Sequence, residues 1–234
     1  MPVIRKILAH ERFHAKHNWL STYHLFSFAD YYDPANMNFG VLRVFNDDTI
    51  DAYSGFGAHS HRDMEIVTIV LEGELTHKDS MGNVGTIKAG EVQYMSAGSG
   101  VTHAEMNEAD KPVHLYQLWI QPGQNGLTPL YEQKDFSQNS NKNILMPVVS
   151  GSSLDEALVI RADVTIYTSV LDAGKSLLYS LSKKRGVYIY VYTGELAIND
   201  IVCRPGDQAC IEGVEDLVIT AATTAEFVLI DTLL

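Results

Sequence analysis

The stretch GFGAHSHRDMEIVTIVLEG, residues 55–73, contains the pattern that decides the fold. Two histidines one residue apart follow a glycine-rich segment, and an apolar run from Ile66 to Leu71 leads to the glycine at position 73. A short run of valine and isoleucine bounded by glycine is typical of a buried β-strand. The sequence therefore predicts that the two histidines lie at the entrance of a buried strand, beside a tight turn.

A second stretch, AGSGVTHAE at residues 97–105, has a similar plan. Successive side chains of a strand point to opposite faces, so His59 and His61 share one face, as do His103 and Glu105. Two such pairs on facing strands would bring together three imidazoles and one carboxylate. This donor set suits a divalent transition metal such as Fe(II), Mn, Ni, Cu or Zn. A lone His-x-His pair is common on surfaces, so the glycine-rich flanks are what favour a metal site at a barrel mouth.

Strand signals dominate the rest of the chain, and helix signals are weak. Several segments are rich in β-branched and aromatic residues, and glycine, Asn-Asp or Pro-Gly separates most of them. These segments are 40–46, 65–71, 91–96, 113–121, 187–192, 195–198, 217–220 and 226–231. Short strands at this spacing predict an all-β protein of the barrel or jelly-roll type with few short helices.

The chain also repeats itself. Residues 70–79 read VLEGELTHKD and residues 191–200 read VYTGELAIND, and each copy continues to a glycine-containing turn. With 234 residues, the simplest prediction is two β-barrels, an N-terminal one at 1–133 and a C-terminal one at 134–234. All nine histidines precede residue 115, so only the N-terminal barrel can hold a histidine-rich site.

Composition excludes several classes of function. The net charge of -12 and the pI of about 5.1 leave no basic surface for direct binding of nucleic acid. No apolar run approaches the length of a membrane span, and the first ten residues lack the features of a signal peptide. We expect a soluble cytoplasmic monomer. Cys203 and Cys210 match no redox or zinc spacing, so we expect two reduced thiols, which identify no function.

Several longer segments together resemble the pirin family of the cupin superfamily, in particular bacterial pirin-like quercetinases. The similarity spans residues 10–133, whereas the C-terminal half is similar only in its plan, that of a degenerate second cupin barrel. The matching segments are NWLSTYHLFSFADYYDP (18–34), LRVFNDD (42–48), the opening stretch (55–73), HKDSMGN (77–83), MSAGSGVTHAEMN (95–107), LYQLWI (115–120) and TPLYEQ (128–133).

The resemblance implies a bicupin with a single metal, normally iron in this family. The ligands that it implies are His59, His61, His103 and Glu105. Many cupins take their carboxylate from the first motif, and Glu65 has the strand parity for that role. In pirins the carboxylate lies two residues after the histidine of the second motif, where this chain has Glu105. We therefore favour Glu105 over Glu65.

The implied activity is that of a metal-dependent dioxygenase similar to pirin-type quercetin 2,3-dioxygenases. A flavonol would bind the metal through its 3-hydroxyl, Glu105 would accept that proton, and O₂ would open the ring with release of CO. Metals other than Fe(II), namely Cu, Ni, Mn, Co or Zn, are compatible with the same ligands. The alternative is a non-enzymatic iron-binding pirin that regulates transcription factors through protein contacts. A pocket large enough for a flavonoid favours the enzyme, whereas a sealed metal beside a flat acidic face favours the regulator.

Three other histidines belong to apolar surroundings. His77 follows the buried strand near a predicted hairpin turn, and we interpret it as a structural histidine rather than a fifth ligand. His24 and His114 lie among apolar residues, so we expect them in the core or in contacts that orient the ligands.

Overall fold

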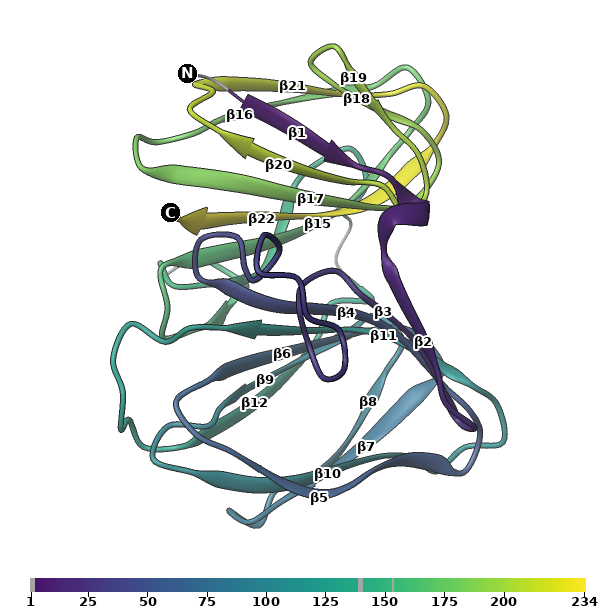
Figure 1. The fold of residues 1–234 in the computed structure, drawn as a ribbon, viewed down its shortest axis with the longest axis vertical. Helices are drawn as coiled ribbons and strands as arrows, with labels where there is room; N and C mark the ends of the chain where they lie inside the picture. The colour runs from purple at the N-terminus through teal and green to yellow at the C-terminus, as the bar shows by residue number, and fades with distance from the viewer. Residues whose placement is uncertain (1–2, 139–140, 153) are drawn as a thin grey trace.

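The chain folds into two stacked β-barrels, each made of a seven-stranded and a four-stranded sheet (Figure 1). A computed structural model describes residues 3–138, 141–152 and 154–234. The predicted all-β class is confirmed, since across these ranges the one helical element is the 3-10 turn η1 (Ala9–Glu11). Within the same ranges no helix has the length and apolar character needed to cross a membrane.

The N-terminal barrel holds the segments that carry both histidine pairs. Its seven-stranded sheet has the order β12 (Leu130–Asp135), β9 (Glu91–Ser96), β6 (Glu65–Glu72), β11 (Val113–Ile120), β4 (Leu42–Ile50), β3 (Leu20–His24) and β2 (Phe13–Lys16). Its four-stranded sheet has the order β5 (Ser54–His61), β10 (Val101–Asn107), β7 (Glu74–Asp79) and β8 (Val84–Lys88). All the pairings within the two sheets are antiparallel.

The C-terminal barrel repeats this plan. Its larger sheet has the order β1 (Val3–Ile7), β20 (Gln208–Glu212), β17 (Arg185–Thr193), β22 (Ala225–Leu233), β15 (Val164–Leu171), β13 (Met146–Ser150) and β14 (Leu158–Val159). Its smaller sheet has the order β16 (Ser176–Ser180), β21 (Asp216–Ala221), β18 (Leu196–Ile198) and β19 (Ile201–Cys203). The first strand of the chain therefore pairs in the C-terminal barrel, although the predicted boundary assigned residues 1–133 to the N-terminal one.

The internal repeat corresponds to the same connection in both barrels. Gly73 joins β6 to β7 and Gly194 joins β17 to β18, in each case from the larger sheet to the smaller one. Their φ angles are 77° and 75°, a left-handed conformation that glycine adopts without strain. The matching GEL segments thus mark the corner at which each barrel closes.

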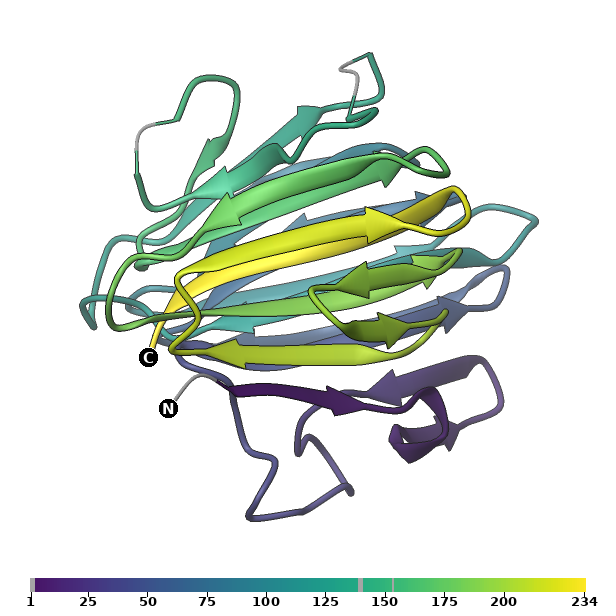
Figure 2. The same ribbon diagram turned by 90° about the horizontal axis from the view of Figure 1, so that it is seen from above.

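The two seven-stranded sheets pack against each other through their outer faces. In Figure 1 they form the two middle layers of the stack, and Figure 2 shows strands of successive layers running in similar directions. One apolar cluster spans the junction, with aromatic contacts between Phe45 of β4 and Tyr188 and Tyr190 of β17. The barrels therefore cover the broad apolar face that each would otherwise expose to water.

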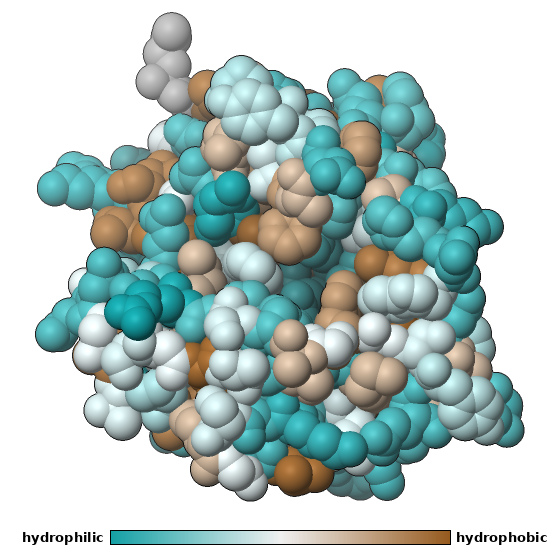
Figure 3. All heavy atoms as spheres, turned by 60° about the horizontal axis from the view of Figure 1, so that its bottom comes forward, coloured by the Kyte–Doolittle hydropathy of each residue, from teal (hydrophilic) through white to brown (hydrophobic). Residues whose placement is uncertain are grey.

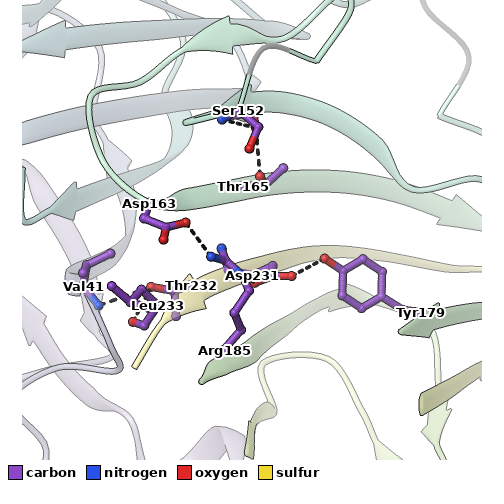
Figure 4. Close-up of polar contacts among 10 residues, drawn as sticks. Val41, Ser152, Asp163, Thr165, Tyr179, Arg185, Asp231, Thr232 and Leu233 are labelled. Carbon is purple, nitrogen blue, oxygen red and sulfur yellow. Dashed lines mark hydrogen bonds and ion pairs between the residues drawn. The ribbon is translucent and has the colours of Figure 1, made fainter. Parts of the chain in front are cut away.

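The interiors of the two barrels differ. A single continuous apolar cluster fills the C-terminal barrel, and an ion-pair network lies at one end of its strands. Arg185 contacts both Asp163 and Asp231, and Tyr179 donates a hydrogen bond to Asp231 (Figure 4). In the N-terminal barrel the interior apolar residues form two smaller clusters. Cys203 and Cys210 are buried free thiols, as predicted.

Candidate metal centre

His59 and His103 face each other on neighbouring antiparallel strands, β5 and β10. The two pairs were expected on facing strands, and they lie instead on adjacent strands of the four-stranded sheet. The ring centroid of His59 is 4.8 Å from that of His61 and 4.4 Å from that of His103. One nitrogen of each ring lies within 4.8 Å of the other two. The structure therefore brings the three predicted histidines together as a group that can hold a metal ion.

A β-bulge gives β5 its inward-facing residues. From His103 to Glu105 strand β10 advances two residues, while β5 moves three residues, from His59 to Phe56. The extra residue lets Phe56 and His59 both face the interior, although strict alternation would place them on opposite faces. Gly55 makes the close approach of the strands feasible, because a Cβ atom there would lie 2.2 Å from the backbone oxygen of Glu105.

Glu105 lies on the His103 side of the site. Its carboxylate forms a second group with His77 and His103, in which one ligand atom of each residue lies within 4.8 Å of the others. Gln117 Nε2 donates a 2.8 Å hydrogen bond to Oε2 of Glu105, whereas Oε1 is buried without a partner. The carboxylate is thus oriented through one oxygen and free to act through the other.

The hydrogen bonds around the rings select the nitrogens that face the site. Nδ1 of His59 donates to the carbonyl of Gly57 at 2.8 Å, which leaves its Nε2 with a lone pair. Nε2 of His77 lies 3.2 Å from Asp79 Oδ2, and Nδ1 of His77 lies 3.4 Å from Nδ1 of His103. If His77 donates to Asp79, it accepts from His103, whose buried and unpartnered Nε2 is then the lone pair available to a metal.

Burial favours the neutral forms of His61 and His103. It lowers the pKa of His61 to about 4 and that of His103 to about 3, with further lowering from the neighbouring rings. Burial also raises the pKa of Glu105, against the hydrogen bond from Gln117. Neutral imidazoles are the form that binds metal, so the protein holds these two histidines ready for coordination. Together with the unpaired oxygen of Glu105, the donor set fits a divalent transition metal.

Glu65 points away from this site. Its Oε1 accepts a 2.9 Å hydrogen bond from Ser96, and its Oε2 accepts one from Tyr94. Tyr94 belongs to the apolar cluster between the barrels and also bonds the backbone of Arg161 in the C-terminal half. Strand parity with His61 fails for Glu65 because the chain turns between β5 and β6, and that turn resets which face each residue occupies.

A cavity of about 460 Å³ opens onto the histidines. Its volume lies within the usual range for small-molecule sites. The wall combines aromatic rings with a polar strip on the inner face of β3, β4 and β11. The lining residues are His17, Trp19, Leu20, Thr22, His24, Phe28, Ala29, Asn46, Asp48, Phe56, His59, His61, Glu105, Gln117 and Trp119.

Most of these lining residues were not predicted from the sequence to belong to the site. Asn46 and Asp48 share a face of β4 because they lie two residues apart, but Asp47 and Thr49 beside them are polar as well, so no alternation in the sequence marks that face as the inner one. His24, which was expected in the core or oriented toward the ligands, lines the cavity and pairs with Asn46 at 2.9 Å. His114 contacts Asp47 at 2.6 Å beside Tyr190 of the C-terminal barrel.

Comparisons with known proteins agree with the fold. Residues 7–120 match the family described as Pirin, and residues 147–232 match the quercetinase C-terminal cupin domain. Quercetin 2,3-dioxygenase of Escherichia coli (strain K12) is 43% identical over 224 residues, which cover 95% of this chain and 96% of the relative. A pirin-like protein of Caulobacter vibrioides is 43% identical over 218 residues, which cover 93% and 94% of the two chains.

Among solved structures, the bacterial pirin YhhW of Escherichia coli in complex with nickel(II) superposes with a TM-score of 0.94. It is 41% identical in sequence, and the match covers 99% of both chains. Fold and site together define a bicupin with a histidine-rich metal site in its N-terminal barrel. The chain belongs to the pirin family.

Proposed function

We propose that this protein is a metal-dependent dioxygenase that opens the heterocyclic ring of flavonols such as quercetin with release of CO. The observation that carries the proposal is the cavity of about 460 Å³, lined by His59, His61 and Glu105. A site that served only to hold a structural metal would be closed to ligands. The relatives named quercetin 2,3-dioxygenase, at 43% identity over nearly the full length, support the same reaction class.

The proposed ligands of one metal ion are His59, His61, His103 and Glu105. We favour Fe(II) because three imidazoles and one carboxylate leave coordination positions for further ligands on an iron-type centre. The nickel(II) bound by the related YhhW is consistent with a site that accepts other divalent ions. When bound, the metal would supply a Lewis acid and a path for electrons between the flavonol and O₂.

Glu105 is the proposed catalytic base. Gln117 fixes one carboxylate oxygen, so the unpartnered Oε1 can accept the proton of the flavonol 3-hydroxyl. Burial raises the pKa of Glu105, which makes its carboxylate a stronger base than one in water. The rings of Trp19, Phe56 and Trp119 form an apolar wall that suits a flat aromatic substrate and excludes water.

The alternative function is regulation of other proteins through contacts, without catalysis. The net charge of -12 is compatible with protein partners of positive charge. The face with the outer end of the N-terminal barrel brought forward mixes polar and apolar residues rather than presenting one broad apolar patch (Figure 3). The open cavity at the histidines favours the enzyme. We also propose that the protein is cytoplasmic, and that it is a monomer, since the barrels already cover each other's broad faces.

O₂ consumption with quercetin tests the proposal. Protein loaded with Fe(II), and separately with Ni(II), is compared with protein stripped of metal by a chelator. Metal-dependent O₂ uptake and loss of the quercetin absorbance would support the dioxygenase. A folded, metal-loaded protein that neither binds nor turns over quercetin would overturn it, and would direct the search to protein partners.

A further inference from the structure

Asp47 and Asp48 are neighbours on β4, and their side chains point to opposite faces of the sheet. Asp47 points toward the C-terminal barrel, where His114 Nε2 and the Tyr190 hydroxyl contact its two oxygens at 2.6 Å and 2.5 Å. Asp48 points into the N-terminal barrel and lines the cavity. The residue is 2% exposed, and its Oδ1 has no hydrogen-bond partner among the residues that the structure describes.

An unpaired buried oxygen is costly. A polar group buried without a hydrogen bond loses its bonds to water and gains none from the protein, so such groups in native proteins call for an explanation. The packing around Asp47 shows that this protein supplies partners where a carboxylate serves structure alone. Oδ1 of Asp48 lacks such a partner at a cavity wall, although Thr22 hydrogen-bonds the carboxyl group, and a bound molecule can provide one.

The strand register places Asp48 further along the cavity wall than the residues beside Glu105. Gln117, which holds Glu105, lies opposite Asn46, and Asp48 lies two residues further along β4 on the same face. Two residues of a strand span about 6.6 Å. A ligand that contacts Glu105 and extends along the inner face of β4 past Asn46 therefore reaches Asp48.

We propose that Asp48 is a specificity-determining residue that hydrogen-bonds a substrate hydroxyl remote from the group that binds the metal. The substrate class is a flat aromatic molecule with a metal-binding hydroxyl at one end and a second hydroxyl toward the other. This inference rests on the proposed function. Burial raises the pKa of Asp48 to about 7, so near neutral pH both the acid, which donates, and the carboxylate, which accepts, are populated.

The test compares two flavonols on four proteins. Quercetin and 3-hydroxyflavone share the 3-hydroxyl, but 3-hydroxyflavone lacks the other hydroxyls of quercetin. Their dissociation constants are measured from the change in flavonol absorbance, without O₂, on Ni(II)-loaded wild type, Asp48→Leu, Asp48→Asn and Asp51→Asn. Leucine removes the hydrogen bond at similar volume, asparagine retains hydrogen-bonding capacity, and Asp51 is an exposed aspartate just past the end of the same strand.

We expect wild type and Asp51→Asn to prefer quercetin, and Asp48→Leu to weaken quercetin binding about 10-fold or more with little effect on 3-hydroxyflavone. Asp48→Asn should retain part of the preference. An unchanged preference in folded, metal-loaded Asp48→Leu would overturn the role of Asp48 alone. Failure of wild type to bind either flavonol would overturn the proposed function, and this inference with it.

Discussion

The Nδ1 atoms of His77 and His103 lie 3.4 Å apart, and both rings are buried. One of these nitrogens must carry a proton and the other a lone pair if the contact is a hydrogen bond. Asp79, which accepts hydrogen bonds from the backbone of Met81 and Asn83, has a lowered pKa and is therefore a carboxylate near neutral pH. Because a carboxylate can only accept, His77 donates from Nε2 to Asp79. Nδ1 of the neutral His77 ring then carries the lone pair and accepts from Nδ1 of His103.

Asp79→Asn should disturb this direction and weaken metal binding. We expect metal affinity to fall about 10–100-fold, the usual effect of removing a partner that orients a metal-binding histidine. Competition with a chromogenic chelator measures the affinity. In the metal-free wild type, nitrogen-15 NMR of the imidazoles should show the His103 proton on Nδ1, and that signal should change in the variant.

Lys78→Ala is the matched control for this experiment. Lys78 lies between His77 and Asp79 on β7, but its side chain is 54% exposed and pairs with Glu108 outside the barrel. Its loss should leave metal affinity and the His103 signal unchanged. If Asp79→Asn behaves like this control, the proposed hydrogen-bond direction is wrong.

Glu105→Gln should separate catalysis from metal retention. Glutamine keeps the shape of the side chain but is not a base, so kcat should fall about 100–10,000-fold. The three histidines should still bind metal at saturating concentration. Steady-state turnover is measured beside metal content by mass spectrometry. Wild-type turnover by the metal-loaded variant would contradict the assignment of Glu105 as the base.

Asp48 should make the protein less stable as the pH rises. Burial raises its folded pKa to about 7, with the charges of Asp47 and Glu105 acting in the same direction, and Thr22 and His114 opposing them. An unfolded aspartate ionises near pH 3.9, so between about pH 4 and 7 the folded state holds a proton that the unfolded state has lost. The free energy of unfolding therefore falls as the pH rises through this range and levels off above about pH 7.

The comparison that isolates this effect is wild type against Asp48→Asn. Without metal, the wild-type free energy of unfolding, relative to the variant, should fall by roughly 3–4 kcal/mol from pH 4 to pH 8. Urea unfolding at both pH values measures it. A constant difference between the two proteins would show that Asp48 titrates like an exposed carboxyl.

The strands and the histidine pairs were predictable because alternation and glycine punctuation are local signals. His59, His61 and His103 come together as expected, since each pair lies on a single strand. The bulge at Phe56 and the turn before Glu65 were not predictable, because both depend on how neighbouring segments pair. Counting strand parity through that turn therefore made Glu65 a candidate ligand, whereas in the fold its carboxylate faces Tyr94 and Ser96.

The alternation of His77 and Asp79 in the sequence was a signal of the site that the prediction did not use. His77 and Asp79 alternate on β7, and the register sets them opposite Glu105 and His103 of β10. His77 was interpreted as structural, and it contacts no solvent, yet its ring lies against a predicted ligand. The cavity wall was beyond local reasoning altogether, since Thr22, Asp48 and Gln117 come from three strands whose order follows from the whole sheet.

The most direct test of the central claim is the amount of CO released per O₂ consumed with quercetin. Fe(II)-loaded wild type is compared with His61→Ala at matched folding, verified by circular dichroism. We predict one CO for each O₂ in the wild type and no turnover in the variant. O₂ consumption without CO, or equal turnover by His61→Ala, would contradict a ring-opening dioxygenase at this site.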